Sequence, residues 1–524
     1  MGNTALETPL PPFIAIPDSI RRAAQRTPEK AAVIFNHQVT RWRDFDRDVD
    51  RTAHYLAALG IRKGDKVAIL GLNSPLYLTA FMGILRAGAV AVPLSTMTAT
   101  DALERMIVDA DTKAIFLAEG FYANIAAIEP RLDGLLEGGK IALDFRAPGW
   151  IPYRAALNAA PSDPFLMEIA ADDEFNIIYS SGTTGLPKGI IHVHSMRSAL
   201  PVRFAAFDFN DTTVSIVSTP IYGNFTLAGM LPALAHGGTV ILMEKFREAE
   251  YLALCEHYRV THAMLVPVQY QRLLALKEFG ATDLSAFRTK FTAGSPMDAG
   301  LKKEILDRWP GRLVELYGLT EGGPGTVLDA SAHPDKLHTV GKAGLSVDLR
   351  ILDADNNSLK AGEVGEVVGR SPLMMMKGYH KQPDKTEELV WKDENGDVFY
   401  RSGDYGKLDE DGFLILLDRK KDMIISGGFN IYAADIEAVL YQHPAVQEVA
   451  VIGIPSKWGE SPLAIVVKVP GAEIDEEALQ TWANERLSKT ARLHAMEFRK
   501  ELPRSTLGKI MKRELRAPYW AKKS

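Results

Sequence analysis

The run from Ser180 to Gly189 concentrates groups that bind anions. It reads SSGTTGLPKG, so ten residues carry four hydroxyls, three glycines and one lysine. Glycines let the backbone approach an anion closely, hydroxyls and main-chain N–H groups donate to phosphate oxygens, and the lysine adds a positive charge. We therefore predict a phosphate-binding loop, and its candidate contacts are Ser180, Ser181, Gly182, Thr183, Thr184 and Lys188.

Two other interpretations of this run are weaker. The P-loop of nucleotide hydrolases needs a Gly-Lys pair followed by Ser or Thr, whereas Lys188 follows Pro187 and precedes Gly189. An ordinary solvated turn is the plainer alternative, because Ser, Thr and Gly gather in turns. The density of donors favours phosphate.

Two further stretches place polar groups where a nucleotide could use them. Thr320 and Glu321 end the sequence YGLTE after an apolar run at Leu313–Leu316, and a neighbouring hydroxyl and carboxylate suit a phosphate oxygen and its Mg²⁺. Asp404 ends the sequence YRSGD and could accept both hydroxyls of a ribose. A tight turn would explain either stretch alone.

The carboxy-terminal part carries two charged features and a glycine pair. Asp418 to Asp422 reads DRKKD, and Gly427 and Gly428 follow it closely. Lys509 follows a glycine near the end of the chain. Taken singly, a charge run is most often solvated surface, and a terminal lysine most often has no specific role.

Short apolar runs alternate with longer helical stretches from residue 31 onward. This pattern predicts an α/β fold with parallel sheets covered by helices. Gly60, Gly88 and Gly237 fall just after helical stretches, as C-terminal caps do. The expected elements are strands at Ala31–Phe35, Lys66–Leu70, Val90–Pro93 and Ala114–Leu117 and helices at Trp42–Leu59, Leu76–Ala87 and Asp101–Ala110.

The last hundred residues predict a compact α+β unit. Its expected strands are Phe413–Leu417, Asp422–Ile425, Glu448–Ile454, Leu463–Val469 and Met496–Glu501, with helices at Asp435–Tyr441 and Asp475–Leu487. The join at Asp409–Gly412 is polar and rich in turn residues. We place the domain boundary at Asp418, which divides the chain into domains 1–417 and 418–524.

Composition limits the partners and the compartment. The 524 residues carry a net charge of −6, which leaves no basic surplus for nucleic acid or for an anionic membrane surface. Cys255 is the single cysteine, which fits a reducing compartment, and we expect a cytoplasmic protein. The amino terminus lacks the pattern of a signal peptide. Leu227–Met243 is apolar but broken by Pro232, so we expect a buried helix and strand without membrane insertion.

Taken together and in this order, the five motifs resemble the adenylate-forming superfamily, which contains acyl-CoA synthetases, nonribosomal peptide adenylation domains and luciferases. The resemblance covers nearly the whole chain. It implies a large amino-terminal adenylation domain and a small carboxy-terminal domain that rotates between two half-reactions. It also implies ATP, Mg²⁺ and coenzyme A as cofactor and co-substrates.

The resemblance also implies a role for each motif residue. The Ser180–Gly189 loop resembles the one that closes over the β- and γ-phosphates. The other implied roles are adenine contact by Gly294, Ser295, Pro296 and Tyr317, α-phosphate contact by Thr320, Mg²⁺ binding by Glu321, ribose contact by Asp404 with Arg419 beside it, a hinge at Asp418, a CoA passage at Gly427 and Gly428, and bridging of carboxylate and α-phosphate by Lys509.

The same resemblance limits the chemical class of the acid substrate and of the acyl acceptor. Relatives that activate amino acids have an aspartate in the segment Thr219–Phe225, which here contains no acid. We also expect no carrier-protein domain, because the chain stops soon after Lys509. A free, bulky, uncharged acid, aromatic or medium-chain, passed to CoA is favoured. The expected acyl pocket consists of Tyr222, Gly223, Phe225, Val266, Gly318 and Gly322.

Two alternatives stay open. An adenylating enzyme of this kind could pass the acyl group to a carrier protein or react with molecular oxygen, although the Gly427–Gly428 pair favours CoA. A homologue that binds nucleotide without catalysis is the other alternative, and the presence of Glu321, Asp404 and Lys509 counts against it. Ile425 departs from relatives that carry lysine there, which concerns the CoA contacts alone.

Overall fold

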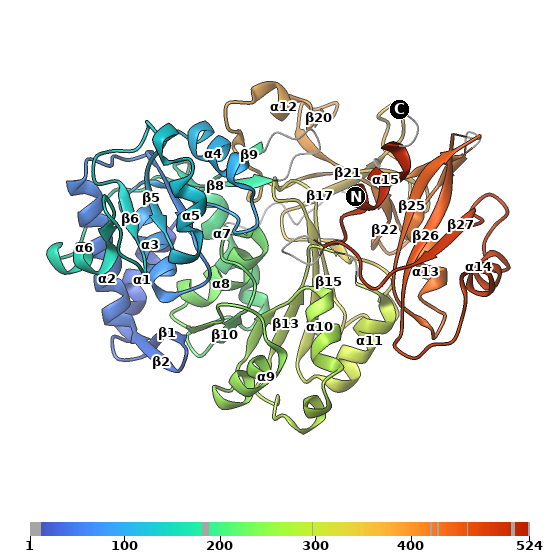
Figure 1. The fold of residues 1–524 in the computed structure, drawn as a ribbon, viewed down its shortest axis with the longest axis horizontal. Coiled ribbons are helices and arrows are strands. Elements are labelled where there is room, and N and C mark those ends of the chain that lie inside the picture. Colours follow the sequence, from blue (N-terminus) through green and yellow to red (C-terminus); the bar gives the residue numbers. More distant parts are fainter. Residues whose placement is uncertain are drawn as a thin grey trace.

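The computed structural model describes residues 12–180, 188–295, 297–419, 422–426, 429–457, 459–504 and 509–521. The described strands form four sheets, with helices packed around them (Figure 1). The α/β class predicted from the alternating pattern is confirmed.

The first sheet is parallel through its centre, where β14, β13, β12, β10, β11 and β1 follow one another, and antiparallel at both edges. Its strands, in spatial order, are β16 (Lys342–Ala343), β15 (Gly325–Asp329), β14 (Arg312–Gly318), β13 (Thr289–Thr292), β12 (His262–Met264), β10 (Val214–Val217), β11 (Thr239–Leu242), β1 (Ala31–Phe35) and β2 (Gln38–Arg41).

The second sheet is parallel from β8 to β7 and ends in an antiparallel β8–β9–β19 edge. Its strands, in spatial order, are β19 (Gly378–Tyr379), β9 (Lys188–Val193), β8 (Glu174–Ser180), β4 (Val90–Pro93), β3 (Lys66–Leu70), β5 (Thr112–Leu117), β6 (Lys140–Ala142) and β7 (Ile151–Pro152).

Helices buried between these two sheets build the main core. In α3 (Pro75–Arg86) ten of twelve residues are buried, because its sequence is apolar on every side. Ser74 caps it by accepting a hydrogen bond from the Tyr77 N–H at 3.1 Å, and Pro75 fits the first turn. The apolar stretch Leu227–Met243 forms most of α8 (Asn224–Ala235) and then β11, as predicted.

The remaining helices cover the sheets or lie at the ends of their strands. They are α1 (Ile16–Arg26), α2 (Trp42–Ala58), α4 (Thr100–Asp109), α5 (Tyr122–Ala126), α6 (Tyr153–Ala159), α7 (His194–Phe204), α9 (Glu248–His257), α10 (Pro267–Leu274), α11 (Ala299–Arg308) and α12 (Pro383–Glu387). In the described residues, no helix is long and apolar enough to cross a membrane.

A third sheet is antiparallel and was not predicted. It is formed by β17 (Asp348–Leu352), β18 (Gly365–Arg370), β21 (Val398–Leu408), β20 (Val390–Lys392) and β22 (Leu414–Arg419). The stretch Asp409–Gly412, which we expected to be a join, is the turn of the β21–β22 hairpin, so the strand expected at Phe413–Leu417 belongs to this sheet. Its Asp409 and Asp411 carboxylates both accept hydrogen bonds from Lys336.

The carboxy-terminal unit contains the fourth sheet, at the right of Figure 1. Its strands are β24 (Phe429–Ile431), β23 (Ile424–Ser426), β26 (Gly459–Lys468), β25 (Val446–Ser456) and β27 (Ala495–Phe498), and its helices are α13 (Ala433–Leu440), α14 (Glu476–Asn484) and α15 (Lys512–Trp520). Alternate residues of β25 and β26 bury apolar side chains on two faces, one against α13 and α14 and the other against α15. The domain boundary at Asp418 stays a prediction.

Candidate active site

The predicted nucleotide-binding residues come from three different sheets. Tyr317 lies at the end of β14 in the first sheet, Ser180 and Lys188 face each other in the β8–β9 hairpin of the second, and Asp404 lies on β21 of the third. The Tyr317 hydroxyl donates to Asp404 Oδ2 at 2.8 Å, and Asp404 is buried. Two predicted residues that are 87 positions apart are therefore in direct contact.

Asp404 has a second predicted neighbour. The β21–β22 pair places the backbone of Arg419 opposite that of Asp404. The order in the sequence gives no reason for this pairing, which depends on the hairpin turn at Asp409–Gly412. The backbone register therefore brings the predicted ribose-binding residue and its predicted companion to the same place in the third sheet.

The main-chain carbonyl groups of Thr320 and Glu321 each accept a hydrogen bond, and these two bonds fix the turn. His192 Nε2 lies 2.8 Å from the Thr320 carbonyl oxygen, and the Met376 N–H donates to the Glu321 carbonyl oxygen at 2.9 Å. The next residue, Gly322, has a φ of +79°, and a Cβ there would lie 1.9 Å from the Met374 carbonyl oxygen. Only glycine fits such an approach.

This packing changes the interpretation of two pocket residues. We assigned Gly322 to the acyl pocket, but the space next to it, and next to its neighbour Gly323, is occupied by protein. A Cβ at Gly323 would meet Tyr400 Cβ at 2.7 Å, and one at Gly318 would meet the Pro324 carbonyl oxygen at 3.2 Å. The missing side chains of Gly322 and Gly323 serve close packing and are no evidence of pocket width.

Lys188 and Glu321 meet through a residue that the sequence analysis missed. The Tyr379 hydroxyl donates to Glu321 Oε1 at 2.7 Å, and Lys188 Nζ lies 4.8 Å from the centroid of the same ring. Burial and the nearby Glu321 carboxylate raise the pKa of Tyr379, so its hydroxyl stays protonated and remains a donor. The contact exists because the two-residue strand β19 pairs with β9.

The environment of Glu321 fits Mg²⁺ delivered with a polyphosphate. Mg²⁺ in such sites takes one or two protein carboxylates, and phosphate and water complete its octahedron. Glu321 is half-buried, and one of its oxygens is oriented by Tyr379. Within the described ranges, no group of three or more His, Cys, Asp or Glu side chains could hold a metal by itself. A single oriented carboxylate is what a metal arriving with its phosphates requires.

The predicted acyl-pocket residues Tyr222, Phe225 and Val266 are all buried. Asn73 holds the segment that carries the first two. Its amide nitrogen donates to the Thr219 and Met243 carbonyl oxygens at 2.9 and 3.1 Å, and its amide oxygen accepts from the Ile221 N–H at 2.9 Å. The segment Thr219–Phe225 is thus fixed to the loop before α3.

Replacing Asn73 with alanine should loosen this segment. The substitution leaves three buried main-chain groups unpaired, so we expect the free energy of unfolding to fall by about 2–3 kcal/mol in urea denaturation. Asn124→Ala, which removes one part-buried contact to Thr100 at 3.1 Å, is the matched control and should cost less than about 1 kcal/mol. Equal losses in the two variants would contradict a special role for Asn73.

Several predicted residues lie elsewhere or outside the described residues. Gly294 and Ser295 follow β13, and Gly294 has a φ of +87°. Ser181, Gly182, Thr183, Thr184, Pro296, Gly427 and Gly428 lie outside the described residues.

Asp418, on β22, and Lys509 are both connected to the carboxy-terminal unit. Asp418 Oδ2 accepts a hydrogen bond from the Ala433 N–H at 2.8 Å, which ties the end of β22 to the start of α13. Lys509 precedes Ile510, which forms an antiparallel bridge with Arg504, and Arg504 pairs with Glu448 at 2.9 Å. The residue next to Lys509 is therefore anchored on the carboxy-terminal unit.

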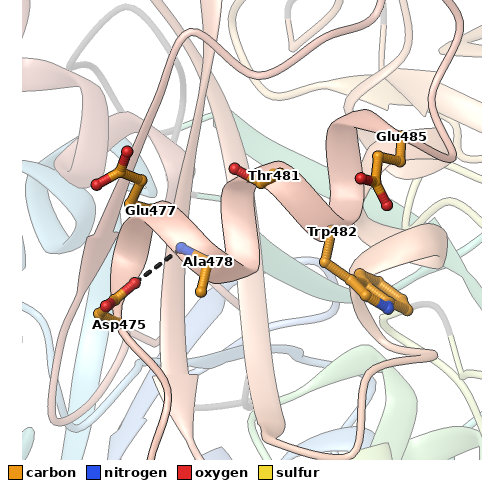
Figure 2. Close-up of a pocket in the computed structure, with 6 residues that line it drawn as sticks. All are labelled: Asp475, Glu477, Ala478, Thr481, Trp482 and Glu485. Carbon is orange, nitrogen blue, oxygen red and sulfur yellow. Dashed lines mark hydrogen bonds between the residues drawn. The ribbon is translucent and has the colours of Figure 1, made fainter.

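A surface depression of about 510 Å³ lies along α14 and is lined by none of the predicted residues. Figure 2 shows Asp475, Glu477 and Glu485 around it, with Trp482 at one side. Three carboxylates would repel a nucleotide, so this depression is not a candidate for the site described above.

Comparison with known proteins identifies the family of this chain. Residues 20–380 match the family model of the AMP-binding enzymes, and residues 435–509 match that of the C-terminal domain of AMP-binding enzymes. The chain belongs to the AMP-binding enzyme family, the adenylate-forming group that its motifs resemble.

Named relatives span almost the whole chain. A feruloyl-CoA synthase from an Amycolatopsis species is 34% identical over 502 residues, which cover 95% of this chain and 98% of that protein. The long-chain-fatty-acid–CoA ligase FadD13 of Mycobacterium tuberculosis is 34% identical and covers 90% of this chain and 92% of its own. The crystal structure of ATP-bound MatB from Rhodopseudomonas palustris superposes with a TM-score of 0.86 at 29% identity, covering 97% of this chain and 99% of its own.

Proposed function

We propose that this protein is an ATP-dependent carboxylate–CoA ligase, which forms an acyl-CoA, AMP and pyrophosphate through an acyl adenylate. The observation that carries the proposal is the meeting of Lys188 and Glu321 on Tyr379, beside the β8–β9 hairpin that bears the hydroxyl-rich loop. A cation and a single carboxylate, both held on one phenol ring, suit a magnesium polyphosphate.

In the first half-reaction a carboxylate oxygen attacks the α-phosphorus, and pyrophosphate leaves with the electrons of the broken P–O bond. Two unit charges of like sign at 4 Å repel by roughly 4 kcal/mol at an effective dielectric near 20. In our proposal Lys509 lies between the carboxylate and the α-phosphate and reverses this sign, while Thr320 donates to the α-phosphate. Mg²⁺ held by Glu321 would neutralise charge on the departing pyrophosphate.

In the second half-reaction the CoA thiolate attacks the acyl carbon and AMP leaves. This step has no need of Lys509 between two anions, but it needs a path for the pantetheine arm. We propose that the carboxy-terminal domain, starting at Asp418, rotates about that residue, withdraws Lys509 and presents Gly427 and Gly428 along this path. A cytoplasmic location, which the single cysteine supports, would supply both ATP and CoA.

The proposed acid is aromatic or medium-chain. Phe225 and Val266 are buried apolar residues, and the segment Thr219–Phe225 has no carboxylate to pair with a substrate ammonium. The similarity to a feruloyl-CoA synthase and to a long-chain-fatty-acid–CoA ligase supports a bulky acid of this kind.

Pyrophosphate release across a panel of acids tests the proposal. The purified protein, ATP and Mg²⁺ would be combined with aromatic, branched and straight-chain acids, each with and without CoA. We expect release that depends on the acid, and acyl-CoA only when CoA is present. Turnover with a carrier protein but not with CoA would favour the carrier-protein alternative, and no ATP consumption with any acid would favour the non-catalytic one.

The contact between Tyr317 and Asp404 gives a prediction about nucleotide affinity. Asp404→Ala removes the proposed ribose acceptor, and we expect the KM for ATP to rise by about 10- to 100-fold. Tyr317→Phe keeps both the ring and the Asp404 carboxylate but removes the 2.8 Å hydrogen bond between them, so the rise should be about 3- to 10-fold. A KM for ATP that is unchanged in both variants would remove Asp404 from the nucleotide site.

A further inference from the structure

Arg197, on α7, is a buried cation that pairs with neutral groups. Its side chain is 1% exposed, and burial lowers its pKa to about 9, so it remains charged at neutral pH. It donates to Asn176 Oδ1 at 3.0 Å, to Asn224 Oδ1 at 2.7 Å and to His192 Nδ1 at 2.7 Å. Among the residues that the structure describes, no carboxylate forms an ion pair with it.

Arg86 shows how this chain otherwise accommodates a buried guanidinium. Arg86 is 2% exposed and pairs with Asp46 Oδ1 at 2.7 Å and with Asp50 Oδ1 at 3.0 Å. Burying a charge without an opposite partner is costly, so a guanidinium needed only for packing would be expected to resemble Arg86. The neutral partners of Arg197 therefore call for another explanation.

The hydrogen bonds around His192, the histidine among these partners, fix its tautomer. Arg197 and Asn176 both donate to His192 Nδ1, from 2.7 and 3.1 Å, so that nitrogen carries no proton. The proton is on Nε2, which donates to the Thr320 carbonyl oxygen at 2.8 Å. Burial and the Arg197 charge hold the pKa of His192 well below its ordinary value, so the ring stays neutral. One side of the guanidinium is thus connected to the turn that precedes Glu321.

The other side is connected to the proposed acid pocket. Asn224 is the first residue of α8 and lies between the pocket residues Gly223 and Phe225. Helices α7 and α8 lie side by side in the structure (Figure 1). Arg197 therefore contacts a residue of the proposed acid-binding segment, Thr219–Phe225, directly. It is connected to the Thr320–Glu321 turn through His192. These two segments are about a hundred residues apart in the sequence and belong to different strand connections.

We propose that Arg197 is a positioning residue for the adenylation half-reaction. Through Asn224 it fixes the segment that holds the acid, and through His192 it fixes Thr320, so that the carboxylate and the α-phosphate are aligned for attack. Small displacements between reacting groups are costly, which makes a rigid common anchor valuable. The planar guanidinium suits the role because it directs several N–H groups at fixed angles. This proposal rests on the function proposed above.

The first test separates the two half-reactions. Arg197→Met should lower kcat/KM for acid-dependent pyrophosphate release by about 10- to 100-fold, the range expected on losing charge-assisted hydrogen bonds. Thioester formation from supplied acyl adenylate should change by less than about threefold, because alignment of the acid with ATP is then complete. Equal losses in the two half-reactions would overturn the proposal, since a general loss of structure has that effect.

The second test separates the two arms of the Arg197 network, which are its contact with Asn224 and its contact with His192. It tests the proposal even if Arg197→Met fails to fold. Asn224→Ala should raise the KM for the acid by about tenfold and leave the KM for ATP unchanged, whereas His192→Ala should do the opposite. His192→Gln, whose amide can accept from Arg197 and donate to Thr320, should restore most of the loss. Identical effects of both alanine variants on both substrates would overturn the proposal.

Arg203, six residues along the same helix, supplies the matched control. Within the described part of the chain it has no hydrogen bond to either arm, and Arg203→Gln should keep both KM values within about twofold of the wild type. A wild-type protein that consumes no ATP would contradict the proposed function itself. An active wild type whose variants show no split between arms would contradict only the role of Arg197.

Discussion

Lys509→Ala should lower the rate of acyl adenylate formation by about a thousandfold. The estimate follows from roughly 4 kcal/mol of repulsion between the carboxylate and the α-phosphate that the lysine would no longer offset. Thioester formation from supplied acyl adenylate should remain within a few-fold of the wild type, because that step joins no two anions. The measurement is pyrophosphate release for the first step and acyl-CoA yield for the second.

The matched control is Lys500→Ala, which removes an exposed lysine from the same unit and should leave both rates unchanged. If Lys509→Ala slowed both half-reactions alike, the lysine would not act between the carboxylate and the phosphate. If it slowed neither, the electrostatic argument for the carboxy-terminal lysine would be wrong.

Gly427→Trp should have the reverse effect. An indole placed in the proposed pantetheine path should lower thioester formation from supplied acyl adenylate by about a hundredfold or more, since misplacing the thiolate by an ångström has effects of that size. Acyl adenylate formation should persist, because in our proposal Gly427 faces the site only after rotation about Asp418. Single-turnover measurements of each half-reaction distinguish the two.

Gly427→Ala serves as the graded control, because a methyl group fills far less of the path than an indole. We expect it to reduce thioester formation only slightly. A Gly427→Trp protein that adenylates as poorly as it forms thioester would contradict the assignment of this glycine pair to the CoA path.

Local patterns predicted several elements of the first two sheets. Strands such as Ala31–Phe35, Lys66–Leu70 and Val90–Pro93 have the predicted bounds, because each is a short apolar run between turn residues. The third sheet was missed because its long strand β21 interrupts its apolar residues with Arg401, Ser402, Gly403 and Asp404, and because β20 has three residues, none of them buried. Half-buried strands of three residues give too few alternations to be recognised.

The sequence predicts which residues belong to the candidate site better than it predicts their contacts. The motif residues Tyr317, Glu321, Asp404 and Lys188 could be selected by type and spacing, but their contacts depend on pairings between distant strands. Tyr379 could not be selected, because only the β9–β19 pairing places it beside Glu321.

Two features of the sequence could have predicted more of the structure. The sequence HVHSMR, from His192 to Arg197, places two histidines and an arginine four to nine residues after the loop lysine, and Asn176 interrupts an apolar strand. Buried polar groups of this kind need partners, so their presence in apolar surroundings predicts a network. Gly322 shows a different effect, since the close approach of two backbone segments already requires a glycine there, whatever its role in the predicted acyl pocket.

The fate of a carboxylate oxygen tests the central claim most directly. An acid labelled with ¹⁸O in its carboxylate would be turned over with ATP and CoA, and the mass of the nucleotide product measured. If the carboxylate attacks the α-phosphorus and the thiolate then attacks the acyl carbon, one labelled oxygen must remain on AMP. We predict AMP that carries one ¹⁸O. Unlabelled AMP, or ADP together with labelled inorganic phosphate, would contradict an acyl adenylate intermediate.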